Sequence, residues 1–179
     1  MALMVVDVQA GVMQECANAA QTIANVARTV ERARAAQVPV IWVQHESDEL
    51  KRDSDAWQWV PALVPAAGEA RVYKQFNSSF EQTNTDELLA QAGVSHIVLA
   101  GAQSNWCIRA TAYGALERGY DLTLVKDAHT TSDLDLGNGT RIDAATIVRD
   151  LNVTMKWLQY PGRRNAVAAA EEVVFGATG

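Results

Sequence analysis

Cysteine is scarce in this sequence, and its scarcity limits what the chain can be. The 179 residues contain only Cys16 and Cys107, with no Cys-x-x-Cys pair and no zinc-type set of ligands. A disulfide framework is therefore not expected. Such cysteine usage fits a protein of the reducing cytoplasm, where a thiol without a partner is free to react.

Long apolar runs and an excess of positive charge are also missing. No stretch approaches the roughly 20 apolar residues that span a bilayer. The first apolar run, Ala2–Val6, has no charged segment before it and leads at once into Asp7, which predicts a strand and not a signal peptide. The net charge of −6 and the pI near 5.0 do not indicate binding to nucleic acid or to an anionic membrane. The expected partner is a small molecule.

Glycine-rich phosphate loops are absent as well. The sequence contains neither Gly-x-Gly-x-x-Gly nor Gly-x-x-x-x-Gly-Lys, and Gly137-Asn138-Gly139 is too short to replace them. Nucleotide binding has no support in the sequence, and no cofactor is expected.

What is present describes one α/β domain. Hydrophobic residues make up 49% and charged residues 20%, and no repeat or Pro/Ser-rich linker divides the chain, so residues 1–179 are expected to form a single domain. Short apolar runs alternate with helical patterns, which favours parallel strands joined by right-handed crossovers. The expected fold is a three-layer α/β sandwich with a mostly parallel six-stranded sheet. The predicted strands cover residues 3–8, 38–44, 70–74, 95–100 and 121–126, and the remainder through 166–168 and 173–175 is expected to form a short sixth strand and a tail. The predicted helices cover about 16–37, 84–92, 104–118 and 140–159.

Polar side chains stand where these strands are expected to end. Asp7, His45 and Lys74 lie at the ends of the first three strands, and His129 lies beyond the fifth. In an open parallel sheet the carboxyl ends of the strands share one edge, where ligands bind. We therefore expect these groups to converge on one edge, or rim, of the sheet. The segment 47–68 has no clear periodicity, and we expect it to pass over this edge and not to form part of the core.

Asp7 and Lys74 are charged residues on otherwise apolar strands. A buried carboxylate is unfavourable unless it is paired, so we interpret Asp7 as a general base and Lys74 as the cation that holds it ionised. Two simpler interpretations stay open: Asp7 can cap the next turn, and Lys74 can be a solvated surface charge.

Cys107 lies between an apolar strand and a predicted helix. In the first turn of a helix, free N–H groups and the helix dipole favour a thiolate and can stabilise an oxyanion. The alternative is an inert buried cysteine, a description that fits Cys16 better.

These residues together resemble a known family. The segment 5–9 around Asp7, the pair Tyr73-Lys74, and the segment 101–119 around Cys107 are similar to the isochorismatase-like cysteine hydrolase superfamily, which includes relatives of nicotinamidase and isochorismatase. The likeness runs from the first strand to the last.

The resemblance implies a mechanism for these residues. Asp7 would accept the thiol proton, Lys74 would support both groups, and Cys107 would form a covalent acyl intermediate. It also implies a cis peptide bond between Ala102 and Gln103, which would aim the Gln103 N–H beside that of Cys107 as an oxyanion hole. Family members that cleave amides need the thiol, so the cysteine favours an amide substrate.

A metal site is not expected. Nicotinamidase-like relatives hold a metal through an Asp-x-His element and a further histidine before the lysine, and the corresponding region here has only His45-Glu46. Asp127-Ala128-His129 has the spacing but follows a different strand, so a site formed by His45 and His129 remains an alternative. A papain-like pairing of His129 with Cys107 is a second alternative.

The substrate pocket is predicted from residues near the rim. Its expected lining residues are Gln9, His45, Trp57, Phe76, Trp106 and His129.

The sequence thus predicts a cytoplasmic, cysteine-dependent hydrolase that cleaves a C–N amide bond of a small molecule through a thioester. Vinyl-ether cleavage of the isochorismatase type, or a non-catalytic binding protein on the same fold, are the alternatives. The resemblance also implies a homodimer or homotetramer.

Overall fold

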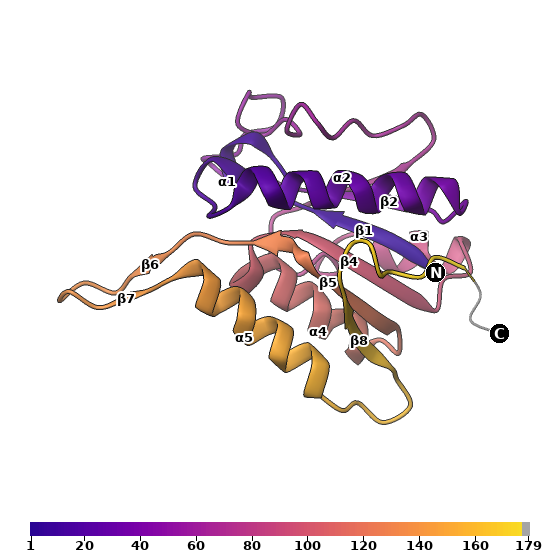
Figure 1. The fold of residues 1–179 in the computed structure, drawn as a ribbon. Coiled ribbons are helices and arrows are strands. Elements are labelled where there is room, and N and C mark those ends of the chain that lie inside the picture. Colours follow the sequence, from indigo (N-terminus) through magenta and orange to yellow (C-terminus); the bar gives the residue numbers. More distant parts are fainter. Residues whose placement is uncertain (177–179) are drawn as a thin grey trace.

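Six parallel strands form the central sheet of the protein, for which a computed structural model describes residues 1–176 (Figure 1). The strand order is β3-β2-β1-β4-β5-β8, and every pairing in this sheet is parallel. The predicted α/β fold is confirmed, with a sheet that is parallel throughout. The predicted domain extends to residue 179, and its last three residues lie outside the described part. The strands are β1 (Ala2–Val6), β2 (Val40–His45), β3 (Ala70–Lys74), β4 (His96–Ala102), β5 (Asp121–Thr130) and β8 (Asn165–Ala168).

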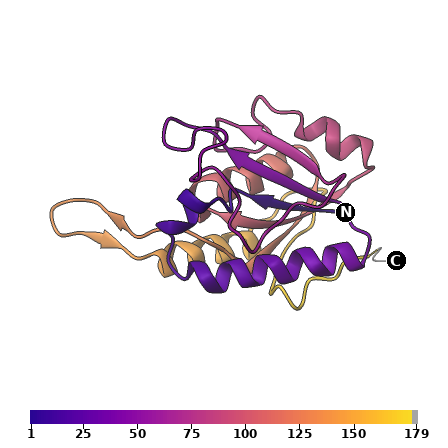
Figure 2. The ribbon, with the colours of Figure 1, turned by 90° about the horizontal axis from the view of Figure 1, so that it is seen from above.

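Helices cover both faces of the sheet and complete three layers (Figures 1 and 2). Side chains of a strand alternate between the two faces, so Leu3 and Val5 of β1 pack with the helix α2, whereas Met4 and Val6 pack toward α3, α4 and α5. A strand buried on both faces must be apolar throughout, which explains the unbroken run before Asp7. The helices are α1 (Ala10–Gln14), α2 (Ala19–Ala35), α3 (Thr85–Gln91), α4 (Arg109–Glu117) and α5 (Ala144–Trp157).

The structure adds a short helix before one predicted helix and divides another. The helix expected over 16–37 is present as α2, which is preceded by the unpredicted short helix α1; Asn18 lies between them in the left-handed conformation at φ 52°, which asparagine tolerates better than most residues. The helix expected over 104–118 begins as a π-helical turn, η1 (Ser104–Ile108), before α4. The Gln103 carbonyl accepts hydrogen bonds from the N–H groups of both Trp106 and Ile108, at 3.1 Å each, which widens this turn.

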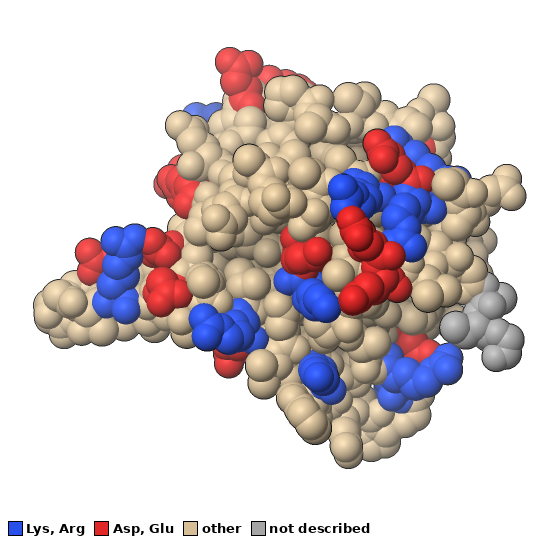
Figure 3. Space-filling model, viewed as in Figure 1, with Lys and Arg blue, Asp and Glu red and all other residues tan. Residues whose placement is uncertain are grey.

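The C-terminal third also differs from the prediction. β5 continues to Thr130, and its pairing with β4 shifts register between Leu99 and Gly101. The hairpin of β6 (Leu134–Asp135) and β7 (Arg141–Ile142) then projects from the body of the molecule (Figure 1) and carries side chains of both charges (Figure 3). The expected helix over 140–159 starts only at α5, where the Asp143 carboxylate accepts a hydrogen bond from the Thr146 N–H.

The short sixth strand predicted in the C-terminal segment is present as β8. The tail that follows it packs beside α2 through Val173.

The segment 47–68 contains no helix or strand, but it belongs to the core more than predicted. Trp57, Val60 and Leu63 are buried, and the last two pack on the α2 face of the sheet. A single antiparallel bridge joins Trp59 to Gln9. No helix within residues 1–176 has the length and apolarity to cross a membrane.

Gly101 allows β4 to lie close to the end of β1. Its φ is +131°, and a Cβ atom at this position would stand 2.0 Å from the carbonyl oxygen of Val6. Only glycine fits here. The close approach brings the residue after Val6, which is Asp7, next to the turn that carries Cys107.

Candidate active site

Asp7, Lys74 and Cys107 meet at the carboxyl edge of the sheet. The ammonium Nζ of Lys74 lies 2.7 Å from Oδ2 of Asp7 and donates a hydrogen bond to Sγ of Cys107 at 3.1 Å. All three side chains are buried, and Asp7 is only 2% exposed. Three residues from distant parts of the sequence therefore form one bonded group.

Asp7, Lys74 and Cys107 are each positioned by a different feature of the backbone. Asp7 follows β1 with φ at +52°, a conformation rare outside glycine and asparagine, so the chain turns sharply where the carboxylate is presented. Lys74 is the last residue of β3, two strands away from β1 in the sheet. Cys107 belongs to the π-helical turn after β4.

His45 adds a fourth group to this cluster. Its Nδ1 lies 3.1 Å from Nζ of Lys74, and burial together with the Lys74 charge lowers the imidazole pKa below its ordinary value. A neutral imidazole with Nδ1 toward an ammonium accepts at Nδ1 and carries its proton on Nε2. Burial opposes the charge of Lys74, but the charge of Asp7 and the hydrogen bonds to Asp7 and Cys107 outweigh burial and raise the lysine pKa.

The environment of Cys107 in the folded protein disfavours the thiolate more than the helix-turn position alone suggested. Burial, reinforced by the negative charge of Asp7, raises the pKa of the thiol to about 12, and Lys74 offsets this only in part. The π-helical turn offers the sulfur only the few free N–H groups of one turn. Burial removes the water that would otherwise stabilise a thiolate, and this loss is the larger effect. Cys107 therefore holds its proton at neutral pH, and a nucleophile forms only when that proton moves to a base.

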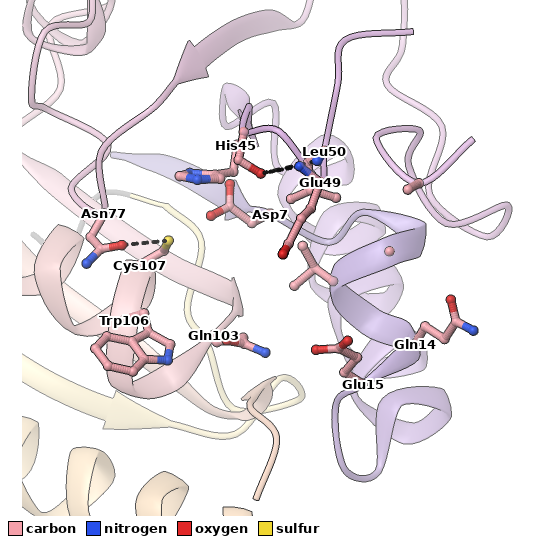
Figure 4. Close-up of a pocket in the computed structure, with 14 residues that line it drawn as sticks. Asp7, Gln14, Glu15, His45, Glu49, Leu50, Asn77, Gln103, Trp106 and Cys107 are labelled. Carbon is pink, nitrogen blue, oxygen red and sulfur yellow. Dashed lines mark hydrogen bonds between the residues drawn. The ribbon is translucent and has the colours of Figure 1, made fainter. Parts of the chain in front are cut away.

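The bond between Ala102 and Gln103 is cis. Gln103 and Cys107 both line the cavity beside the triad, four positions apart along the same turn. The thiol faces Asn77, whose Oδ1 lies 3.9 Å from Sγ (Figure 4).

A cavity of about 620 Å³ opens in front of the thiol. That volume suits a small-molecule ligand. Asp7, His45 and Cys107 stand at one end of it, and Trp106 and Gln103 form the side that faces α1 (Figure 4).

Four of the residues predicted to line this pocket, Gln9, Trp57, Phe76 and His129, do not line it. Gln9 is fully buried. Its side-chain amide forms hydrogen bonds with the backbone of His45 and of Trp57 and so holds these two segments together. Trp57 is buried against Tyr73, with ring centroids 5.8 Å apart. Phe76 is 38% exposed but lies outside the cavity lining. The sequence located these residues near the rim but could not show which way their side chains point.

His129 lies on the far side of the Cys107 turn. Its Nδ1 is 2.8 Å from the Ser104 hydroxyl and its Nε2 is 3.1 Å from Oδ1 of Asn152. Full burial lowers its pKa to about 4. Both ring nitrogens are used within the fold, so the predicted pocket role, the papain-like pairing with Cys107 and a shared metal site with His45 are all wrong.

Comparison with known proteins assigns the chain to a family. A family model described as the isochorismatase domain matches residues 1–147. The chain belongs to the isochorismatase family. The crystal structure of an isochorismatase from Pseudomonas putida superimposes with a TM-score of 0.86 at 27% identity, covering 97% of this chain and 89% of that one. The resemblance to isochorismatase-family hydrolases drawn from the motifs is thereby confirmed.

Relatives within the isochorismatase family differ in their named roles. A streptothricin hydrolase of Streptomyces noursei is 33% identical over 144 residues, which cover 77% of this chain and 57% of the relative. A secreted isochorismatase effector of Verticillium dahliae is 32% identical over 129 residues, covering 70% and 65%. The chain spans between 50% and 65% of the length of the first three curated relatives that it matches.

The residues of this isochorismatase-family domain do not fit a metal ion. Asp7, His45 and Cys107 offer ligand atoms within 4.8 Å of one another, but the ammonium of Lys74 contacts all three. A bound cation would stand beside that fixed positive charge, which is unfavourable.

Sequence reasoning missed several residues of the cavity. Glu15, Glu49 and Asn77 line it, and none was predicted. Glu15 follows α1 and Glu49 lies in the patternless segment after β2, so no periodicity in the sequence marks either one.

Proposed function

We propose that this domain hydrolyses a C–N amide bond of a small molecule through a thioester on Cys107. The observation that carries the proposal is the single buried ammonium of Lys74, which holds the Asp7 carboxylate and the Cys107 sulfur on either side of it at the inner end of a cavity. A base beside a nucleophile, both oriented by a third group, is the arrangement that covalent catalysis requires.

Acylation begins with proton transfer. Oδ1 of Asp7 is buried and has no hydrogen-bond partner within the described residues, so it is available to accept the thiol proton. The sulfur then bonds to the substrate carbonyl carbon, and the carbonyl oxygen becomes an oxyanion that the N–H groups of Gln103 and Cys107 would stabilise. When the C–N bond breaks, Asp7 returns the proton to the leaving nitrogen, and ammonia or an amine departs.

Hydrolysis of the thioester reverses these roles. Asp7 accepts a proton from a water molecule, whose oxygen attacks the acyl carbon while the C–S bond breaks. The proton passes back to sulfur, so the carboxylic acid product leaves and the free thiol is restored. Throughout the cycle Lys74 keeps its proton and stabilises the negative charge on either neighbour.

A screen of small amides for release of ammonia or amine tests the proposal. We expect turnover of at least one class of amide by the native protein and a loss on the order of 10⁴-fold in Cys107→Ser. Cys16→Ser is the matched control and keeps most of the activity, because Cys16 contacts no residue of the triad within the described chain and meets Gln103 only through that residue's side-chain amide, at 3.8 Å. Undiminished turnover by Cys107→Ser contradicts the thioester route. The alternative, vinyl-ether cleavage by Asp7 and Lys74, instead predicts no amide turnover and an active Cys107→Ala variant on a vinyl ether.

The cellular setting stays a prediction. A nucleophilic thiol needs a reducing compartment, which favours the cytoplasm. Assembly into a homodimer or homotetramer is likewise a prediction for this domain.

A further inference from the structure

The mouth of the cavity carries negative charge. Glu15 lies at the C-terminal end of α1, and Glu49 lies in the segment after β2, so two separate elements each contribute one carboxylate. Figure 4 shows both carboxylates turned into the space between α1 and the Trp106–Gln103 side. Both side chains are exposed, and neither carboxylate has an ion-pair or hydrogen-bond partner within residues 1–176.

No cation of the described chain balances these charges in the cavity. Its fourteen lining residues include Asp7, Glu15 and Glu49 but neither lysine nor arginine. The ammonium of Lys74 lies beneath the cavity and is bonded to Asp7. Arg52, the arginine that follows Glu49 most closely in the chain, pairs with Glu46 and lies over the ring of Tyr73. A concave surface lined by one sign of charge concentrates ligands of the opposite sign.

Two further features show that this end of the molecule is built to hold a ligand. At the inner end, Asp7 lines the same cavity and its buried Oδ1 has no hydrogen-bond partner within the described residues, so a donor on a bound molecule could satisfy it. Trp106 is 49% exposed and offers an indole ring on the cavity wall. An aromatic face near carboxylates is a favourable environment for an organic cation.

We propose that the preferred substrate carries an ammonium or guanidinium group on the part of the molecule beyond the scissile carbonyl, held at the mouth by Glu15 and Glu49. The proposal rests on the amide hydrolysis proposed above and names its substrate class. The carbonyl lies at Cys107, and the positive charge lies toward α1. Amides that bear a carboxylate in the same place are repelled.

Three primary amides of similar length provide the test. They are 6-aminohexanamide, which is a cation at neutral pH, hexanamide, which is neutral, and adipamic acid, which is an anion. We expect kcat/KM, measured by ammonia release, to be about tenfold higher for the amine than for hexanamide, and lowest for the acid, since each exposed carboxylate contributes modestly. The preference should shrink as sodium chloride is raised from low concentration to 0.5 M.

Removal of the two mouth charges sharpens the test. In Glu15→Gln/Glu49→Gln the preference for the amine over hexanamide should fall to near unity, because kcat/KM for the amine falls far more than kcat/KM for hexanamide. The matched control is Glu31→Gln/Glu87→Gln, which removes two exposed glutamates on α2 and α3 without touching the cavity and keeps the preference. Equal rates on all three amides in the native protein, or a preference for the acid, overturn the proposal.

Binding separates this proposal from the proposed function. Isothermal titration of the same three amides into Cys107→Ser measures the charge preference without turnover. If no amide is hydrolysed but the amine still binds about tenfold more tightly than hexanamide, amide hydrolysis fails and the cation site stands. If hydrolysis occurs but the amine binds no better than hexanamide, or not at all, only the cation site fails.

Discussion

At the inner end of the cavity the ionisable groups are buried and bonded to one another, whereas at its mouth they are exposed and unpaired. Lys74 contacts Asp7, His45 and Cys107 within 3.1 Å, while Glu15 and Glu49 face solvent. Burial fixes geometry and shifts pKa values, and exposure leaves charge to act over a distance. The inner end is therefore suited to chemistry and the mouth to selection, and substitutions in the two regions should have different consequences.

Loss of the base should have the largest effect on activity. Asp7→Asn retains the shape of the side chain and tolerates the left-handed backbone, but it cannot accept the thiol proton, so kcat/KM should fall by about 10² to 10⁴-fold. Glu15→Gln, by contrast, should leave the rate on a neutral amide within about twofold. Steady-state kinetics on one neutral amide compares them. Equal losses of kcat/KM in Asp7→Asn and Glu15→Gln would contradict the assignment of chemistry to the inner end and of selection to the mouth.

Loss of the buried cation should have the largest effect on stability. Lys74→Met leaves the Asp7 carboxylate buried without its partner, which should lower the free energy of unfolding by about 3–5 kcal/mol. Asp7→Asn/Lys74→Met removes both charges and should recover more than half of that loss while remaining inactive. Urea unfolding at pH 7 measures both variants. Lys126→Met is the control, since Lys126 pairs with Glu172 on the surface and contributes less than about 1 kcal/mol.

The buried ring of His129 should make the fold sensitive to acid. Its pKa of about 4 lies below the ordinary 6.5, so between these values the unfolded chain binds a proton that the folded chain does not. The stabilisation is complete above pH 6.5 and is lost as the pH falls toward 4, a decrease of about 3 kcal/mol. Urea unfolding at pH 7 and at pH 4.5 should show a smaller difference in His129→Gln. An unchanged pH dependence in that variant would contradict the assignment.

The smallest effect concerns the reactivity of Cys107 in the free protein. Because its thiol pKa is raised to about 12, alkylation by iodoacetamide should be slow at pH 7 and rise about tenfold per pH unit up to pH 9. The measurement is made in the Cys16→Ser variant, in which Cys107 is the one remaining cysteine. A rate that levels off near neutral pH would mean that Lys74 and the turn outweigh burial.

The sequence predicted the inner end of the cavity because topology alone brings its residues together. Asp7, Lys74 and the turn of Cys107 each follow an apolar strand, and parallel strands present their carboxyl ends on one edge. The six-stranded sheet followed from the same alternation. The raised thiol pKa could not be predicted, since it depends on how much water reaches the sulfur in the folded protein.

The mouth could not be predicted because it depends on side-chain direction and on loop paths. Glu15 follows α1, a short helix that the sequence pattern did not predict, and the chain then turns at Asn18 into α2. Trp57 was expected in the pocket, but it packs on Tyr73 instead. Segment 47–68 has no periodicity, so only the structure shows that its first residues line the cavity and its later ones enter the core.

Trapping the acyl group tests the role of Cys107 most directly. The protein is mixed with an amide that it turns over, quenched in acid during the steady state, and digested for mass spectrometry. The mechanism predicts that the peptide containing Cys107 gains the mass of the acyl portion, and that Cys107→Ala shows neither the adduct nor turnover. Steady turnover with no adduct at Cys107, together with an active Cys107→Ala variant, would contradict it.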